Sequence, residues 1–351
     1  MAEVNQQTIA ERLGLSKATV SRCFTNHAGI SAVTRARVFQ LAAEIGYNHS
    51  ENRSPAARIK QRKARFTVLI CSETEEYFRG EYESPGEEIL SGVSEFAQLN
   101  DIAVGVHFIP PQVKDLDDPA FRNIKELRSK ASRGVLLIYP FPAPFVKQLA
   151  DRFPLVSLVE QLDRNAIDCV DVNHYHGISC IIDHLVASGH QRIGFYTRDY
   201  ATEASWSFRR YSAFVEKMAW LGLKIRPKDV VGMFPHRYSS MKNGISAAIE
   251  QTKSGVTAWV CAADHQAYDL IDSFQKEGLK VPKDVSVTGF DGIRRSASRP
   301  DLTTVEIPFR SIGMTGADRL AARIRKRFGG EQHVYIAGHL RPGKTVGPPS
   351  R

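Results

Sequence analysis

The heptapeptide "SKATVSR" (residues 16–22) combines small side chains with two cations. Its first serine is a residue type that caps a helix, because the hydroxyl accepts a hydrogen bond from a backbone N–H two or three positions further on. Val20 and Phe24 are four positions apart and therefore share one helical face, which we expect to be buried. The outward face then carries Lys17, Ala18, Ser21 and Arg22.

Two more helices are predicted on either side of this segment. Before it, Ile9 and Leu13 lie one turn apart, and Gly14 can adopt the positive φ of a tight turn. After it, a helix begins at Ser31 and ends at Gly46. The side chains of this third helix that we expect to be buried are Val38, Leu41, Ala42 and Ile45. Three short helices with one free face predict a helix-turn-helix, whose second helix enters the major groove of DNA.

The polar side chains of these helices suit a DNA surface. Lys17 and Arg22 carry donors that reach O6 and N7 of guanine, and each good base contact contributes about 1–3 kcal/mol of discrimination. Other side chains are placed to bind phosphates, which fixes the register without reading the sequence. These are Thr19, Ser21, Ser31, Thr34 and Arg35. The alternative is a small helical interaction domain whose cations are incidental.

The charge distribution favours the DNA interpretation. The 351 residues carry a formal net charge of +9. Residues 1–65 hold eleven Lys and Arg against four Asp and Glu, so this end contributes +7 and the rest is nearly neutral. A basic end on a near-neutral body indicates a module for a polyanion joined to a module with another task.

Over residues 8–47 the sequence resembles the headpiece of the lactose-repressor (LacI/GalR) family. The family pattern is an Ile/Val–Ala pair, then Gly-Val-Ser, Thr-Val-Ser-Arg and Val-Ser-x-x-Thr-Arg, and "TIAERLGLSKATVSR" and "ISAVTR" occupy these places here. The resemblance implies that Lys17, Ala18 and Arg22 read bases. It also implies backbone contacts for Ser16, Thr19, Ser21, Ser31 and Thr34. Thr25 departs from the family, which usually has Asn at that position.

The segment after the third helix departs further from the family pattern. The family has Tyr-x-Pro-Asn-x-x-Ala-Arg-x-Leu, a hinge helix whose Leu wedges into the minor groove, and Ala56 stands at the Leu position here. A shifted register, "SPAARI" (residues 54–59), offers a helix start and Ile59 as the wedge, in which case the protein kinks DNA. Otherwise the basic run that includes Arg58 is a tether that makes binding more salt-dependent, or a solvated linker.

From Phe66 onward, short β-branched runs alternate with amphipathic helical patterns. The expected strands cover residues 66–70, 101–109, 134–139, 154–159, 192–196, 258–263 and 284–290. The expected helices cover residues 87–99, 177–188, 207–221, 240–253 and 266–277. This alternation predicts an α/β fold with parallel sheets covered on both faces. The body is too long for one such sheet, so we expect two similar lobes.

The body resembles the same family, which has a periplasmic-binding-protein-like domain of two lobes here. The most specific match is "VPKDVSVTGFD" (residues 281–291), followed by "LTT" (residues 302–304). We therefore expect a helix-turn-helix domain over residues 1–48, a hinge or linker over 49–65, and an effector-binding and dimerisation domain over 66–351. Within the body, lobe one is expected at about residues 66–172 and 299–329, and lobe two at about 173–298 and 330–345.

Ligands in such clefts are held by loops at the carboxyl ends of strands. The resemblance implies that Arg210 and Asp264 clamp vicinal hydroxyls of a sugar as donor and acceptor. The alternative is that both are satisfied by each other or by solvent. The aromatic contacts that the resemblance implies are Tyr77, Phe78, Phe234 and Tyr238. Ala263 and Val159 replace the family's Asn and Asp, which weakens the case for a particular sugar.

No catalytic or metal-binding motif competes with this interpretation. The five cysteines stand far apart without a Cys-x-x-Cys pair, and there is no glycine-rich nucleotide loop or nucleophile elbow. His174 and His176 are expected in a surface turn and not at a metal. Asp163 and Asp168 are expected as exposed carboxylates of a polar loop. We therefore expect no cofactor, no metal and no enzymatic activity.

The sequence also lacks the features of a membrane or exported protein. No apolar stretch approaches the roughly 20 residues that span a bilayer, and the N-terminus has no signal-peptide core. Dispersed cysteines favour a reducing compartment. We therefore expect a cytoplasmic protein with no membrane partner.

Together these features predict a transcription regulator that binds a double-stranded DNA operator as a homodimer. A small polar effector, a carbohydrate by the resemblance, is expected between the two lobes. Two headpieces related by a two-fold axis imply palindromic half-sites. The alternative keeps the DNA-binding headpiece but makes the body a protein-interaction platform with a vestigial cleft, which the departures at Val159 and Ala263 favour.

Overall fold

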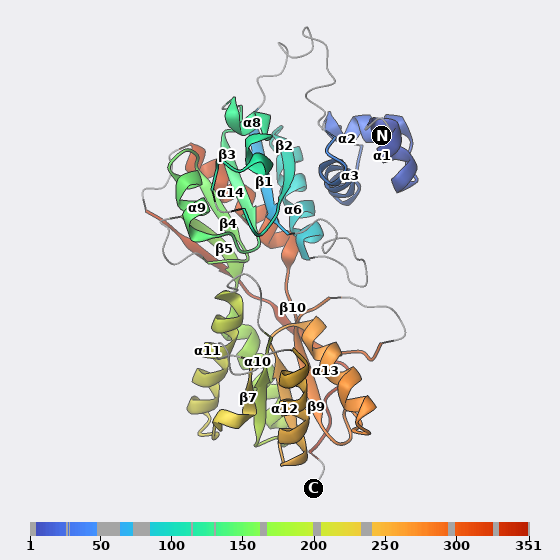
Figure 1. Cartoon of the computed structure of the whole chain (residues 1–351), viewed down its shortest axis with the longest axis vertical. Helices are drawn as coiled ribbons and strands as arrows, with labels where there is room; N and C mark the ends of the chain where they lie inside the picture. Colours follow the sequence, from blue (N-terminus) through green and yellow to red (C-terminus); the bar gives the residue numbers. More distant parts are fainter. Residues whose placement is uncertain are drawn as a thin grey trace. The chain divides into compact units, whose positions relative to one another are not determined.

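The fold comprises an N-terminal helical unit and two α/β lobes (Figure 1). This computed structural model describes residues 5–25, 27, 29–47, 64–72, 85–113, 115–129, 131–161, 167–198, 205–232, 241–293, 299–325 and 330–349. Among the helices in these ranges, none has the length and apolar character needed to cross a bilayer.

The N-terminal unit consists of α1 (Gln6–Leu13), α2 (Lys17–Phe24) and α3 (Ala32–Glu44). The Asn5 side chain caps α1, and Gly14 has a φ of 63°, which lets the chain turn sharply into α2. The three helices bury a small common core. It contains Ile9, Ala10, Val20, Cys23, Val38, Leu41, Ala42 and Tyr47. Val20 and Cys23 thus place one face of α2 in this core, and the other face of α2 is left outside it.

The first lobe is built on a six-stranded sheet with the order β11-β5-β4-β3-β1-β2. Its strands are β1 (Arg65–Cys71), β2 (Ala103–Ile109), β3 (Gly134–Ile138), β4 (Leu155–Leu158), β5 (Asp168–Val172) and β11 (His333–Ile336). Strands β1 to β5 pair in parallel. The helices of this lobe are α6 (Pro85–Leu99), α7 (Pro119–Arg122), α8 (Lys125–Arg128), α9 (Ala143–Ala150) and α14 (Phe309–Ile324).

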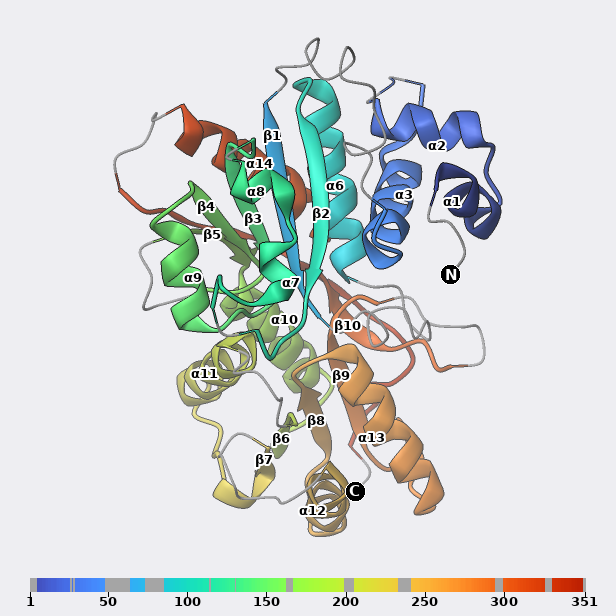
Figure 2. The same cartoon turned by 45° about the horizontal axis from the view of Figure 1, so that its top comes forward.

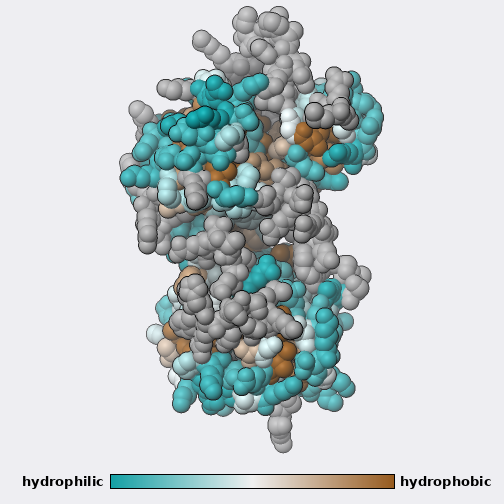
Figure 3. Space-filling model, viewed as in Figure 1, coloured by the Kyte–Doolittle hydropathy of each residue, from teal (hydrophilic) through white to brown (hydrophobic). Residues whose placement is uncertain are grey.

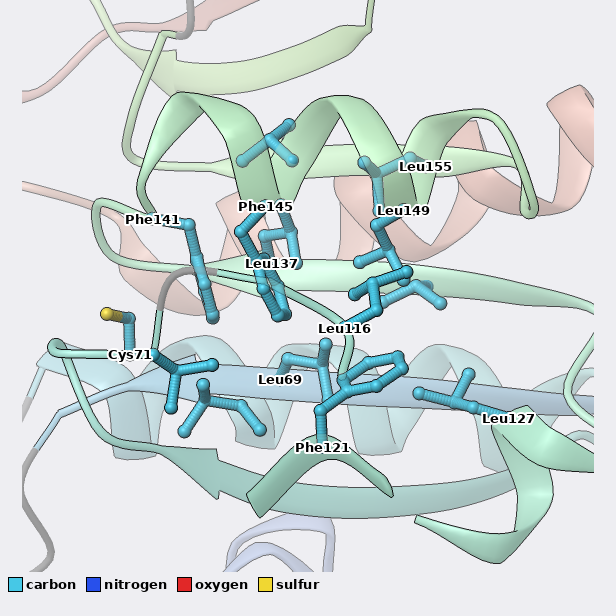
Figure 4. Packing of buried hydrophobic residues seen from close by; sticks show 14 of the residues in the cluster. Leu69, Cys71, Leu116, Phe121, Leu127, Leu137, Phe141, Phe145, Leu149 and Leu155 are labelled. Atoms are coloured by element: carbon cyan, nitrogen blue, oxygen red, sulfur yellow. The ribbon is translucent and has the colours of Figure 1, made fainter. Parts of the chain in front are cut away.

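Aromatic rings fill the space between this sheet and α9 (Figure 4). The rings of Phe141 and Phe145 stack with centroids 5.4 Å apart. Phe121 meets Phe145 edge to face at 5.5 Å. Leu69 of β1 and Leu137 of β3 reach the same cluster from the sheet and are fully buried. The uninterrupted apolar strands are therefore explained by a sheet that is covered on its faces.

The second lobe repeats this plan with the strand order β12-β10-β9-β8-β6-β7 (Figure 2). Its strands are β6 (Ile193–Tyr196), β7 (Val230–Val231), β8 (Ala258–Cys261), β9 (Ser286–Asp291), β10 (Thr303–Glu306) and β12 (His339–Arg341). Its helices are α10 (His174–Ala187), α11 (Ser205–Trp220), α12 (Met241–Lys253) and α13 (Asp264–Lys276). The described surface in Figure 3 is mostly hydrophilic, as expected when the apolar runs lie inside.

The bounds of the two lobes differ from those expected near the C-terminus. We expected residues 299–329 in lobe one, but β10 pairs with β9 and so belongs to the second sheet. We expected residues from 330 on in lobe two, but β11 lies in the first sheet, beside β5. The chain therefore crosses between lobes just before α14 and again after β11, and these crossings give no periodic signal.

Asp168 corrects another expectation. It is not an exposed loop carboxylate but the first residue of β5, and its side chain is 0% exposed. Nε of Arg319 on α14 donates to its Oδ2 at 2.5 Å, and the backbone N–H of Gln332 donates to Oδ1 at 2.9 Å. The Arg323 guanidinium lies 3.6 Å away. Asp168 thus ties α14 and the segment before β11 to the sheet. Asp163 lies outside the described residues.

Candidate DNA interface and effector site

The three residues predicted to read bases lie on the exposed face of the second helix. The Oγ atom of Ser16 accepts the N–H of Thr19 at 3.0 Å, which fixes the start of α2. From there Lys17, Ala18 and Arg22 all point outward and are exposed, whereas Val20 and Cys23 on the opposite face are fully buried and Phe24 is half-buried. This helix therefore offers two cations around a small side chain, a shape that can enter a groove.

Hydroxyl groups mark the N-termini of α2 and α3. Ser31 repeats the arrangement at Ser16, because its Oγ accepts the N–H of Thr34 at 3.1 Å and lies 2.8 Å from the Thr34 hydroxyl. Ser16 and Ser31 are exposed, and Thr19, Ser21 and Thr34 are half-buried. Helix N-termini and their capping hydroxyls bind phosphate well. Phosphate contacts by these five side chains stay a prediction.

Arg35 was expected to bind phosphate, and the structure corrects this. Arg35 is only 1% exposed, and its Nη2 donates to the backbone oxygens of His27 and Ile30 at 2.9 and 3.3 Å. Burial also lowers the pKa of its guanidinium. Arg35 therefore holds the loop between α2 and α3 and is turned away from solvent. The position of Arg35 on α3 did not reveal its burial. The guanidinium donors suit phosphate and loop carbonyl oxygens equally well, and the sequence does not show which of the two they meet.

Six predicted site residues lie outside the part of the chain that the structure describes. They are Arg58 and Ile59 of the hinge, and Tyr77, Phe78, Phe234 and Tyr238 of the effector site. Their roles stay predictions of the resemblance.

Arg210 of α11 is the centre of a polar cluster at the carboxyl edge of the second sheet. Its Nε donates to Nδ1 of His174 at 3.3 Å. Its Nη1 lies 3.0 Å from Oδ1 of Asp291 and also donates to the carbonyl oxygen of Ala262. The sequence had suggested Asp264 as the counterpart of Arg210, and the structure instead pairs Arg210 with Asp291.

The guanidinium of Arg210 is also held between two aromatic rings. Its Cζ lies 4.6 Å from the ring centroid of Trp206 and 4.0 Å from that of Phe290. Stacking and cation–π attraction fix the plane of the guanidinium and therefore the direction of its donors.

Asp264 was expected to contact the effector, and the structure corrects this as well. It begins α13, is 0% exposed and has both carboxyl oxygens bonded to protein. Oδ1 accepts from the hydroxyl of Thr304 at 2.5 Å, and Oδ2 accepts from the backbone N–H of Ile293 at 2.7 Å. Asp264 therefore supports the chain next to the site.

Asp291 and His174 are the site residues that the sequence argument missed. Asp291 ends β9, at the carboxyl edge where ligands of such sheets bind, and its side chain is 12% exposed. That position at a strand end was the available signal. His174 was expected in a surface turn together with His176, but both lie in α10 and His174 is buried. Only the contact with Arg210 in the structure shows that His174 belongs to the polar cluster.

His265, the second residue of α13, is a half-buried, neutral group at this edge of the lobe. Burial and the nearby guanidinium groups of Arg198 and Arg210 lower the pKa of His265 to about 3. The imidazole is therefore neutral at any physiological pH and can donate and accept hydrogen bonds. Among the described side chains, no group of three or more His, Cys, Asp or Glu is arranged to hold a metal ion.

The comparisons with known proteins agree with this architecture. Residues 7–50 match the family model for bacterial regulatory proteins of the lacI family. Residues 182–346 match a periplasmic binding protein-like domain. The chain is 28% identical to the HTH-type transcriptional repressor MelR of Bacillus subtilis (strain 168) over 344 residues, which cover 92% of each chain.

Two solved structures share the fold over nearly the whole chain. The Lac repressor dimer bound to operator and the anti-inducer ONPF has a TM-score of 0.65 and 22% identity, and it covers 98% of this chain and 99% of that one. The complex of the transcriptional regulator CelR with cellobiose also has a TM-score of 0.65, with 20% identity and coverage of 97% and 99%.

A helix-turn-helix unit followed by a periplasmic-binding-protein-like body of parallel sheets defines a class of bacterial regulatory proteins. The chain carries a lacI-family helix-turn-helix segment followed by a periplasmic binding protein-like domain, and it is similar over most of its length to lacI-type transcriptional repressors such as MelR. The family resemblance and the α/β fold class predicted from the sequence are thereby confirmed.

Proposed function

We propose that the protein is a sequence-specific DNA-binding transcription regulator controlled by a small carbohydrate effector. The observation that carries the first part is the exposed face of α2, where Lys17, Ala18 and Arg22 stand free on a helix whose other face is buried. A helix in this position reads base edges in the major groove, and the hydroxyls at the starts of α2 and α3 bind the phosphates beside it.

The regulator acts as a homodimer on two half-sites. One headpiece contacts few base pairs, and a two-fold pair doubles the contact and reads a palindrome. The hinge that contains Arg58 and Ile59 joins each headpiece to its body. Ile59 is the proposed wedge and Arg58 a proposed backbone contact.

Replacing Arg22 by alanine should remove discrimination at one base pair of each half-site. The expected loss is about 1–3 kcal/mol per contact on duplexes that the wild type selects from a random pool, and much less on unselected duplexes. Arg37→Ala is the matched control, because Arg37 is an exposed arginine on α3. Fluorescence anisotropy with labelled duplexes measures both. An equal loss on selected and unselected DNA would contradict base reading by Arg22.

The effector part rests on the polar cluster of the second lobe. Arg210 supplies fixed donors and Asp291 supplies acceptors at the carboxyl edge of the sheet, and such donor–acceptor pairs suit vicinal hydroxyls. Cellobiose in the CelR complex shows that a protein of this fold accommodates a sugar. No catalysis is proposed, since a ligand that only shifts a conformational equilibrium needs no reaction.

A sugar panel tests the effector directly. Glucose, sucrose and cellobiose are added to the full chain and thermal unfolding is followed. A bound sugar at 100 times its dissociation constant should stabilise the folded state by about 2.7 kcal/mol. By linkage, that sugar must also change the affinity for operator DNA. A panel of mono- and disaccharides that leaves both the unfolding temperature and DNA binding unchanged would favour a body that binds protein partners.

A further inference from the structure

The carboxyl group of Asp264 fixes the backbone at the end of β9. Oδ2 accepts the N–H of Ile293, two residues beyond Asp291, and Oδ1 accepts the hydroxyl of Thr304 on β10. Strand β9 passes so close that a Cβ atom at Gly289 would collide with Oδ1 of Asp264. One side chain at the start of α13 therefore holds both the segment just after β9 and the neighbouring strand β10.

Asp291 makes a reciprocal contact with the backbone of Asp264. Its carboxylate accepts the backbone N–H of Asp264 as well as the donor of Arg210. The side chain of each aspartate thus holds the backbone of, or just beyond, the other. Asp291 has a φ of 141° and is followed by Gly292 at 77°, a sparsely populated backbone that persists only when its surroundings hold it. The bond from Asp264 to Ile293 is one such restraint.

Two buried carboxyl groups that repel one another do not both ionise easily, and the surroundings of Asp264 and Asp291 differ. Burial raises the pKa of Asp291 as well, but the ion pair with Arg210 opposes this shift and favours the charged form there. Asp264 is fully buried, and burial followed by repulsion from Asp291 raises its pKa. The Thr304 hydroxyl donates to Oδ1 of Asp264, which favours the ionised form and partly offsets the rise in pKa, and it can accept from the protonated form instead. The titratable or charged side chains around Asp264 are Asp291, Arg341, Cys261 and Tyr268.

We propose that Asp264 and Asp291 share a single negative charge, with Asp264 acting as a positioning residue that orients Asp291 toward the effector without touching the effector itself. The inference rests on the proposed function of this lobe. It adds Asp264 as a second acid that supports Asp291, the proposed effector-binding acid. Asp291 carries the negative charge that pairs with Arg210 and accepts from the sugar hydroxyls. Asp264 holds the backbone that sets the position of Asp291.

The sign of the resulting pH dependence follows from linkage. The pKa of Asp264 is raised in the folded protein, so the folded state binds this proton more tightly than the unfolded chain does. The stabilisation is complete below the ordinary aspartate pKa and is lost as the pH rises through the raised value. An asparagine at this position mimics the protonated acid, because its oxygen can accept from Ile293 and its amide can donate to Thr304.

Asp264→Asn tests this without any effector. The unfolding temperature of the variant minus that of the wild type should rise by about 5–10 °C between pH 5 and pH 8 in the full chain. Asp272→Asn, an acid-to-amide change two turns further along α13, is the control and should give a flat difference curve. A flat curve for Asp264→Asn as well would overturn the shared charge.

Thr304→Val keeps the proposal testable should Asp264→Asn fail to fold. The Thr304 hydroxyl lowers the pKa of Asp264, so its removal should move the pH at which stability is lost to a higher value. No displacement of that midpoint would count against the proposal.

The positioning role has its own readout. With whichever of glucose, sucrose or cellobiose stabilises the wild type most, Asp291→Asn should abolish the response, whereas Asp264→Asn should retain it with a weaker dependence on pH. Loss of the response in both variants alike would contradict a supporting role for Asp264. If no sugar acts on the wild type, the proposed effector fails while the pH measurement still decides the shared charge.

Discussion

Asp168→Ala is expected to destabilise the first lobe by about 3–5 kcal/mol. Asp168 and Arg319 are 0% and 6% exposed, and their ion pair at 2.5 Å joins β5 to α14. Removal of the carboxylate leaves the Arg319 guanidinium buried without its counter-charge and also removes the acceptor of the Gln332 N–H. Breaking one side of a buried ion pair costs far more than the pair contributes as a whole.

The measurement is thermal or urea unfolding of the variant beside a surface control. Asp183→Ala breaks the ion pair with Lys217 at 2.8 Å, but the Asp183 side chain is 56% exposed, so this loss should be about 1 kcal/mol or less. Equal effects of the two substitutions would show that Asp168 does not tie α14 to the sheet.

Arg210→Lys should weaken sugar binding by roughly 10–100-fold while the protein stays folded. Lysine keeps the positive charge near Asp291 but has no planar group to lie between Trp206 and Phe290. A single ammonium also cannot reproduce the directed donors toward His174, Ala262 and Asp291. Hydrogen bonds to charged groups contribute about 1.5–3 kcal/mol each, which gives the size of the expected loss.

Titration with the most stabilising sugar of the panel measures this effect. Arg209→Lys is the matched control, since Arg209 is the neighbouring residue on α11 and is half-exposed. Unchanged affinity in Arg210→Lys would mean that the guanidinium only braces the lobe.

The sequence was most informative where the signal is local. The caps at Ser16 and Ser31, the turn at Gly14 and the four-residue spacing of Val20 and Phe24 lie within one or two turns of the helices that they define. Local spacing also predicted that Lys17 and Arg22 are exposed. The alternation of β-branched runs and helices predicted parallel sheets, since that pattern too is set by neighbours in the chain.

Contacts between distant residues escaped the sequence argument. Asp168 meets Arg319 across 151 positions, so nothing beside Asp168 in the chain marks it as buried. The partner of Arg210 was taken as Asp264 although Asp291 lies at the next strand end, because register between strands decides which acid faces the guanidinium. Arg35 was misassigned because its acceptors are loop carbonyls, which the sequence of α3 does not specify.

Selection of duplexes from a random pool by the full-length wild type and by Arg22→Ala tests the central claim most directly, namely that the free face of α2 reads bases. The wild type should recover a two-fold symmetric consensus, and the variant should recover the same consensus with preference lost at one position in each half-site. An unchanged consensus for Arg22→Ala, or no consensus for the wild type, would contradict the account.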